Sequence, residues 1–358
     1  MAYTTIDKPT DYFRTKLYTG NGTNDTAITW DETDTNMQPN WLWIKNRSEG
    51  DQSHALFDSV RGATKRLSSN ENSAEGTEAT NLDSFDSNGF TVDNEVIVNG
   101  SSDLMVAWGW KAGTSVSGNT TGSGTAKAYT GSVSTTAGFS IIRYLGNGTD
   151  GHTIPHHLGV APKMIIVKST AGSRSWIVLP PVTDGHDKDL KLNDTDAIGD
   201  SDVWNNVAPS STVFSVGSNA VMNANDVALI AYCFAPKQGY SKFGSYTGNG
   251  NADGTFIYTG FKPAFVMIKA TDAVKSWMIL DNKRNPAGLS GANTIRYRLS
   301  PNTNAATSDN GDGHDFYSNG FKHFGTDTST NQNGTNYIYM AFAENPFATS
   351  TGVPATAR

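Results

Sequence analysis

Apolar residues in this chain gather in short runs of four to seven positions, rich in Val, Ile, Phe, Trp and Tyr and bounded by Gly, Asn or Pro. Runs of this length and composition are typical of β-strands. Two of them, residues 41–44 and 265–268, are apolar at every position, as expected of strands in the middle of a sandwich. No long segment has the period of an amphipathic helix. The pattern predicts an all-β protein with short helical turns at most.

The strand pattern occurs three times along the chain. A Tyr-x-Gly-Asn-Gly segment is found at residues 18–22, 144–148 and 246–250, and an apolar run follows each copy. Each run starts at a proline and reaches a lysine six residues later. Recurrence of this kind indicates one structural unit copied along the chain. The three lysines are Lys45, Lys168 and Lys269. They are interpreted either as contacts to an anion or glycan, or as lysines at strand ends whose aliphatic stems lie on apolar surface.

Short strands at this density favour antiparallel pairing in sandwiches. We therefore predict three tandem antiparallel β-sandwich units, of jelly-roll or lectin-like type. The first unit, with an N-terminal arm, covers residues 1–112, the second covers 139–238, and the third, with a C-terminal tail, covers 239–358. Residues 113–138 are dominated by Gly, Ser and Thr, which predicts a flexible linker or a long exposed hairpin.

Composition narrows the classes of protein that fit. Only 17% of the 358 residues are charged, against about 25% in typical soluble proteins. The net charge is −7 without a basic block, so no nucleic-acid partner is expected. No apolar run is long enough to span a membrane, and the first residues lack the apolar core of a signal peptide. The single cysteine, Cys233, excludes a disulfide framework and a cysteine-based zinc site.

Candidate ligand-binding residues are of two kinds. An Asp-Arg pair with a spacing of three residues follows a strand in the first unit (Asp58, Arg61) and in the third (Asp281, Arg284), but not in the second. The planar fork of such an arginine suits a carboxylate or sulfate, although the pair more often closes a turn. Aromatic side chains outside the matched strands can contact a ligand or pack in the core. These are Trp30, Trp204, Tyr240 and Tyr317.

A calcium ion is the one cofactor for which the sequence contains candidate ligands. Asp309, Asp312 and Asp315 lie in a polar, glycine-rich segment that resembles a calcium loop. Gly311 stands where a third-position oxygen ligand is needed, and no glutamate occupies the twelfth position. A polar loop without metal fits these residues equally well, so no cofactor is expected.

No catalytic motif is legible in the sequence. A Gly-x-Ser-x-Gly elbow is absent, and the acidic residues lie mainly in Asp/Asn/Gly-rich segments rather than as a recognisable pair across a cleft. Cys233 lies inside an apolar run, where a thiol is expected to be buried and inert. The sequence therefore predicts a protein that is not an enzyme.

The chain resembles a widespread group of bacteriophage proteins, common in marine phages and usually called tail-fibre-like or virion structural. The likeness runs from the first residues to near the C-terminus. The group has no catalytic residues that could be transferred to this sequence. The segments that carry the resemblance include residues 1–7, 17–22, 43–48, 57–62, 137–140, 158–162, 243–250, 259–269 and 338–347.

The resemblance implies a virion structural protein that is assembled in the bacterial cytoplasm. It is expected to form a homo-oligomer within the particle and to contact other virion proteins. The favoured function is a tail-fibre or tail-associated role in host attachment, through non-catalytic binding of surface glycans. The alternative is a purely architectural capsid decoration or tail adaptor protein, in which three similar units mimic three subunits around a pseudo-threefold axis. A polysaccharide-degrading tail enzyme is disfavoured, because no extended β-helix pattern or carboxylate pair is recognised.

Overall fold

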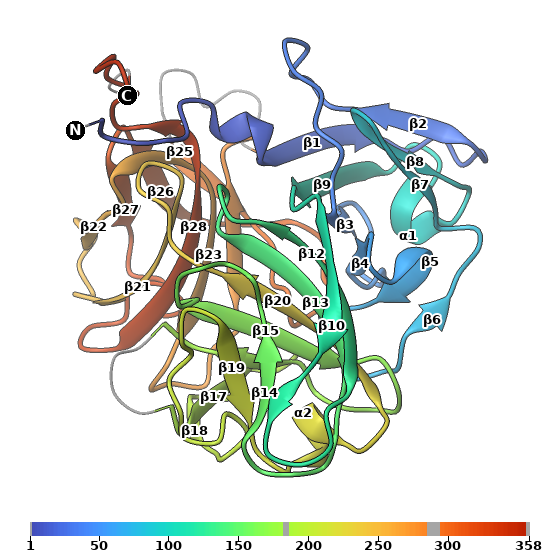
Figure 1. Cartoon of the computed structure of the whole chain (residues 1–358). Helices are drawn as coiled ribbons and strands as arrows, with labels where there is room; N and C mark the ends of the chain where they lie inside the picture. Colours follow the sequence, from blue (N-terminus) through green and yellow to red (C-terminus); the bar gives the residue numbers. More distant parts are fainter. Residues whose placement is uncertain (1, 182–185, 285–293, 356–358) are drawn as a thin grey trace.

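The computed structural model describes residues 2–181, 186–284 and 294–355. The prediction of an all-β fold built from antiparallel β-sandwich units is confirmed. We call the three units first (β1–β9), second (β10–β20) and third (β21–β28), and each has an inner and an outer sheet (Figure 1). No helix among the described residues is long and apolar enough to cross a membrane.

The first unit has an inner sheet of order β1-β9-β3-β4-β5-β6 and an outer sheet of order β2-β8-β7. A 3-10 helix, η1 (Pro9–Asp11), precedes the strands, and α1 (Val96–Asn99) lies between β8 and β9. The strands are β1 (Phe13–Thr19), β2 (Thr26–Thr29), β3 (Trp41–Asn46), β4 (Ala55–Asp58), β5 (Gly62–Leu67), β6 (Gly76–Thr77), β7 (Leu82–Asp86), β8 (Gly89–Val92) and β9 (Leu104–Trp110).

The second unit repeats this plan with additional strands. Its inner sheet has the order β10-β12-β13-β20-β15-β16-β17-β18, and its outer sheet the order β11-β14-β19. One short helix, α2 (Ala220–Asn223), precedes β20 as α1 precedes β9. The strands are β10 (Thr114–Asn119), β11 (Thr121–Gly122), β12 (Ala128–Ser134), β13 (Phe139–Leu145), β14 (His152–Pro155), β15 (Met164–Ser169), β16 (Ile177–Leu179), β17 (Lys188–Lys191), β18 (Gly199–Asp200), β19 (Val213–Val216) and β20 (Ala228–Phe234).

The third unit has two sheets of four strands, an inner one of order β21-β28-β23-β24 and an outer one of order β22-β27-β26-β25. The central pair, β23 and β28, is the longest antiparallel pairing of the chain's described residues and contains a bulge at Pro263. The strands are β21 (Ser241–Thr247), β22 (Phe256–Tyr258), β23 (Phe261–Ala270), β24 (Met278–Asp281), β25 (Thr294–Arg298), β26 (Ser308–Tyr317), β27 (Gly320–Phe324) and β28 (Asn336–Pro346).

Residues 113–138, for which the sequence left a linker or a long hairpin open, contain β10, β11 and β12. β10 pairs with β12, and β12 pairs with β13, so the segment extends the inner sheet of the second unit. Most side chains of β10 are exposed. The strand is therefore held by backbone pairing rather than by an apolar face, which is why its sequence lacks a strand pattern.

The inner sheets are apolar on both faces because each face packs against something different. In β3, Trp41 and Trp43 belong to a central core, whereas Leu42 and Ile44 pack against the outer sheet of the first unit. The same alternation occurs in β15 and in β23. Side chains alternate between the two faces of a strand, so each of these three strands contributes to two cores at once.

Aromatic contacts in the central core join each unit to the other two. The Trp41 ring of the first unit is stacked on Tyr232 of the second, with 4.5 Å between ring centroids. Phe13 of the first unit is stacked on Phe342 of the third at 5.3 Å, and Phe342 meets Phe234 of the second at 6.0 Å. The three inner sheets therefore enclose one shared core at the centre of the molecule (Figure 1).

Hydrogen bonds from buried side chains also link successive units. Trp176 Nε1 in the second unit donates to the Ser68 carbonyl of the first at 2.9 Å. Trp277 Nε1 in the third donates to the Lys191 carbonyl of the second, also at 2.9 Å. These two tryptophans occupy the same place in their repeats, directly after a serine and directly before a core strand.

The first unit has His54 at this place, and it closes the ring of contacts. His54 Nδ1 accepts a hydrogen bond from Trp43 Nε1 at 2.8 Å, so the proton of the neutral imidazole is on Nε2. Nε2 lies 3.1 Å from the Ser300 carbonyl of the third unit, to which it donates. Equivalent hydrogen bonds thus join the second unit to the first, the third to the second, and the first to the third. This arrangement gives the molecule pseudo-threefold symmetry.

The recurring Tyr-x-Gly-Asn-Gly segment is a structural joint around a buried asparagine. In the first unit, the Tyr18 hydroxyl donates to the Val98 carbonyl at 2.6 Å, Asn21 N donates to Asn99 Oδ1, and Gly22 N donates to the Asn99 carbonyl, both at 2.9 Å. The same three bonds form around Asn223 and Asn331 in the other units. In each unit the motif therefore joins the end of one inner strand (β1, β13 or β21) to the short segment before the last strand of the unit (β9, β20 or β28).

Candidate functional site

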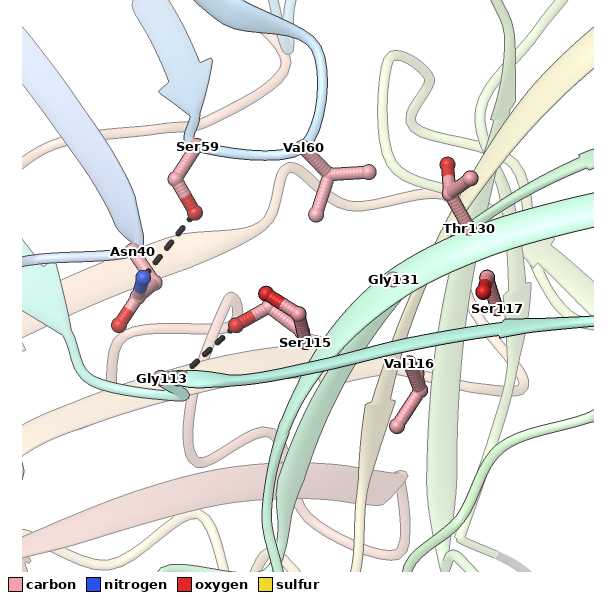
Figure 2. A pocket seen from close by; sticks show the side chains of 10 residues that line it. Asn40, Ser59, Val60, Gly113, Ser115, Val116, Ser117, Thr130 and Gly131 are labelled. Carbon is pink, nitrogen blue, oxygen red and sulfur yellow. Dashed lines mark hydrogen bonds between the residues drawn. The ribbon is translucent and has the colours of Figure 1, made fainter.

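An open groove of about 600 Å³ lies between the first unit and the β10–β12 pair (Figure 2). Hydroxyl and amide groups dominate its lining, and the described lining residues include no charged side chain. The lining residues are Asn40, Ser59, Val60, Gly113, Ser115, Val116, Ser117, Thr130, Gly131 and Ser132.

Asn40 fixes the wall of the groove where the two units meet. Its Nδ2 donates to Ser59 Oγ at 3.0 Å, as drawn in Figure 2, and its Oδ1 accepts from Ala112 N at 2.9 Å. Gly113 then turns the chain into β10 with a positive φ of 112°, a backbone conformation that favours glycine. Its N–H donates to Ser132 Oγ at 2.8 Å.

The floor of the groove follows the close pairing of β12 with β13. A side chain at Gly131 would place its Cβ 2.5 Å from the Ile141 carbonyl oxygen, so only glycine fits there. The exposed hydroxyls of Ser115 and Ser117 stand on β10. Neutral donors and acceptors of this kind bind polar ligands through hydrogen bonds, and no described lining residue supplies an acid-base pair.

The structure places three of the four aromatic candidates in the core. Trp30, Trp204 and Tyr240 are 2%, 1% and 1% exposed, and Trp30 Nε1 donates to the Met37 carbonyl at 2.8 Å. These rings are packing residues and do not reach a ligand on the surface. Tyr317 is half-buried at the end of β26, with its ring edge-on to that of Phe256 at 6.0 Å.

The Asp-Arg pairs are buried between units rather than presented to solvent. Asp58 Oδ2 lies 2.5 Å from Arg61 Nε and accepts a hydrogen bond from the Tyr232 hydroxyl of the second unit at 2.7 Å. Asp281 Oδ2 has the same relation to Arg284 and accepts from Trp108 Nε1 of the first unit at 3.1 Å. Arg61 and Arg284 therefore stabilise the seams between units, and their side chains are not available to an external anion.

The three repeated lysines are buried as well. Each Nζ donates to the carbonyl of the following residue, and Lys168 and Lys269 also reach a carbonyl of the preceding unit at 3.2 Å, those of Asn72 and Thr195. Burial lowers the pKa of Lys45, Lys168 and Lys269 to about 8 in each case. All three are structural lysines, and Lys168 and Lys269 join their units to the preceding one.

The aspartates of the suspected calcium segment lie in strand β26, not in a loop. Asp309 Oδ1 is 3.0 Å from Arg296 Nε and accepts from Gly311 N at 2.9 Å. Asp315 is 2% exposed and its Oδ2 accepts from the Tyr317 hydroxyl at 3.4 Å. The side chain of Asp312 lies outside the described residues. Within the described ranges, no three His, Cys, Asp or Glu side chains are grouped to hold a metal ion.

Cys233 is fully buried, and burial raises the pKa of its thiol to about 12. A thiol in this state is not a nucleophile near neutral pH.

The groove residues, in contrast, were not singled out by the sequence. The sequence feature that could have indicated part of the groove is the hydroxyl-rich composition of residues 113–138. That composition predicts a linker or hairpin and does not by itself indicate a binding surface.

The family model described as a domain of unknown function (DUF7483) matches residues 8–346. No curated protein matches the chain, and neither does any solved structure. The matched range includes strands of all three units, so the shared core and the three equivalent seams lie within it. The chain belongs to the DUF7483 family.

Proposed function

We propose that this chain is a structural protein of a bacteriophage particle, mounted on the tail, that helps to attach the particle to glycans of the host surface without catalysis. The observation that carries the attachment role is the open groove of about 600 Å³ lined by Asn40, Ser59, Ser115, Ser117 and Thr130. Hydroxyl and amide groups on a rigid surface match the hydrogen-bonding groups of a sugar chain. The resemblance to tail-fibre-like phage proteins supports the particle assignment.

A second candidate function, an architectural decoration or adaptor protein, is favoured by a different observation. The equivalent bonds made by His54, Trp176 and Trp277 arrange the three units around a pseudo-threefold axis. A monomer of this shape matches sites of three- or sixfold symmetry in a particle. In this role the chain contacts other virion proteins, forms a homo-oligomer within the particle, and needs no glycan.

The position of the chain in an intact particle distinguishes the two functions. Labelling or imaging of particles is expected to place it at the tail. Density on the capsid shell would exclude the attachment role and support decoration. The bacterial host cytoplasm is the expected site of assembly.

Glycan binding tests the groove directly. Purified protein is expected to bind host envelope glycans at millimolar concentration, and Ser117→Arg is expected to weaken binding at least tenfold by filling the groove. Thr326→Arg, at an exposed position of the third unit, is the matched control and should leave binding unchanged. Absence of binding by the unaltered protein would contradict attachment, whereas release of reducing sugar would indicate an enzyme.

A further inference from the structure

A second hollow, of about 150 Å³, adjoins the groove on the second unit. We call it the side hollow. Thr130 of β12 lines both hollows, and Arg143 of β13 contributes to the lining of the second one. The groove, whose described lining is uncharged, therefore has a guanidinium group beside it.

Ser117, Thr130 and Arg143 form a row across β10, β12 and β13. Ser117 is paired with Thr130, and Thr130 with Arg143, in antiparallel register. Residues directly opposite each other in neighbouring strands have their side chains on the same face of the sheet. Ser117 and Thr130 stand at one end of the groove (Figure 2). Because neighbouring strands lie about 4.8 Å apart, the row of two hydroxyls and one guanidinium spans about 10 Å.

The side chains of this row are accessible to a ligand. Ser117, Thr130 and Arg143 are all exposed. The next residue in the same register, Ile230 of β20, is buried in the central core. The row is thus the part of the second unit's inner face that the other units leave uncovered.

Arg143 differs from the other arginines that the structure describes. It alone is exposed, and no carboxylate of the described residues forms an ion pair with it. The arginines that are paired with an aspartate or glutamate are Arg14, Arg61, Arg66, Arg284, Arg296 and Arg298. The donors of Arg143 are therefore available to an anion from outside the chain.

The chemistry of the row matches a ligand that carries hydroxyl groups and an acidic group close together. A guanidinium group offers a planar fork of donors that binds a carboxylate or sulfate through two hydrogen bonds. The hydroxyls of Ser117 and Thr130 can both donate to and accept from the hydroxyls of a sugar. The net charge of −7 gives no long-range attraction to an acidic polymer, so a preference for one has to come from this local contact.

We propose that the groove and the side hollow together bind an acidic glycan. Sugar hydroxyls form hydrogen bonds with Ser117 and Thr130, and the carboxylate or sulfate of the sugar lies on Arg143. The proposal rests on the proposed glycan-binding function and names the class of glycan that the groove selects.

Oligogalacturonate and its methyl ester are matched probes, because the ester keeps the sugar chain and removes the charge. Calorimetric titration of the full-length protein at low salt is expected to show at least tenfold tighter binding of the acid. Dextran sulfate and dextran form a second pair, in which the acidic group is a sulfate. A preference within the first pair identifies a carboxylate as the group bound, and a preference within the second identifies a sulfate.

Substitution of Arg143 assigns the preference to the row. Arg143→Gln should abolish it, Arg143→Lys should keep part of it, and neither should change the melting temperature, because the side chain is exposed. Lys163→Gln is the matched control, since it removes the same charge from an exposed position of the same unit and should leave the preference intact.

A preference for the charged probe in either pair that Arg143→Gln removes supports the proposal. Equal binding of charged and neutral probes in both pairs, or a preference that survives Arg143→Gln, overturns it. If host glycans bind in a manner that Ser117→Arg weakens and Arg143→Gln leaves unchanged, only this inference fails. If neither the probes nor host glycans bind, the attachment role fails with it.

Discussion

At the scale of single residues, the buried Asp58 carboxylate shows why the three repeats differ in sequence where they are equivalent in place. Its partner across the seam, Tyr232, is the fifth residue of β20, and Trp108, the fifth residue of β9, plays that part for Asp281. The fifth residue of β28 is Met340, which has no strong donor, and the second unit has Pro180 in place of the aspartate. An aspartate thus occurs in the two units whose neighbour across the seam supplies a hydrogen-bond donor, and it is absent from the unit that faces methionine.

Removal of the Asp58 carboxylate should therefore be severe. Asp58→Ala leaves the buried Arg61 guanidinium with Glu75 Oε2, 3.1 Å from Nη1, as its remaining carboxylate partner. We expect the free energy of unfolding to fall by about 3 kcal/mol in denaturant titrations. Tyr232→Phe removes only the hydroxyl that donates to Asp58, and a loss of about 1.5–3 kcal/mol is expected. Equal losses in the two variants would contradict the burial of the pair as the main cause.

The buried lysines give the stability a defined pH dependence. Burial holds the pKa of Lys45, Lys168 and Lys269 at about 8, whereas the unfolded chain has the ordinary value of 10.5. Between these values the unfolded state binds more protons, so stability should rise with pH from about 8 towards 10, by at most about 1.4 kcal/mol per pH unit for each lysine. Ionisation of tyrosines in the unfolded chain opposes the rise above about pH 10.

Unfolding by urea at pH 7.5 and pH 9.5 checks the sign and the residues. Lys168→Met fills a similar volume without a titrating group, and it should reduce the gain in stability between the two pH values. Lys163→Met is the matched control, because Lys163 is exposed directly before the same strand and its substitution should leave the gain unchanged. A stability that falls over this interval in the unaltered protein would refute the assignment.

At the scale of elements, the repeated joint around a buried asparagine is the feature on which each unit depends. Asn99 Nδ2 donates to Asn21 Oδ1 and to the Thr23 carbonyl, at 3.0 and 2.9 Å, while its Oδ1 accepts from Asn21 N. The Gly20 position is equally constrained, because a Cβ there would collide with the Gly100 carbonyl oxygen. Tyr, Gly and Asn recur together because each makes a different contact to the same segment.

Substitution of the buried asparagine tests the joint. Asn99→Ala removes the hydrogen bonds that the buried side chain forms with Asn21, Thr23 and Thr26, and a loss of about 2–4 kcal/mol in the free energy of unfolding is expected. Asn225→Ala, at an exposed position in the equivalent turn of the second unit, should change stability by less than about 0.5 kcal/mol. Thermal or denaturant unfolding of both variants provides the comparison, and similar small effects would contradict a structural role for the motif.

The sequence predicted the inner strands well because their physical cause is local. Residues 41–44 alternate between two apolar environments, and a run that is apolar at every position records this directly. The β10–β12 pair could not be predicted in the same way, since its exposed side chains leave no apolar pattern and its pairing depends on β13. Asn99 was missed, although an asparagine five residues before the last strand of every unit was a readable signal.

The candidate site was harder to predict than the fold, because its residues meet only after the units have packed. Asn40 and Thr130 are far apart in sequence and line one groove. Trp30 and Trp204 carry no mark in the sequence that separates a core aromatic from an exposed one. Composition and repetition thus indicate what the units are, whereas the seams between units decide which side chains remain accessible.

At the scale of the whole molecule, the shared core makes the units mutually dependent. Each inner sheet has one face that is covered only when the other two units are in place, and those faces carry Trp41, Tyr232 and Phe342. A unit produced alone would expose a large apolar patch, which soluble monomers rarely do. We therefore expect residues 113–238, which contain every strand of the second unit, to aggregate or remain unfolded when produced in isolation, whereas the full chain is expected to stay soluble.

The same dependence predicts one cooperative unfolding transition for the full chain rather than three. Calorimetry should give a single peak, and Trp41→Ala, which leaves a void beside Tyr232 and Phe234, should lower that peak as a whole by a destabilisation of about 3–5 kcal/mol. Leu82→Ala, in the separate core of the first unit, is the matched comparison: it too should move the single peak without splitting it. Separate transitions, or a shift confined to one of several peaks, would mean that the units fold independently and that the central core is not what unites them.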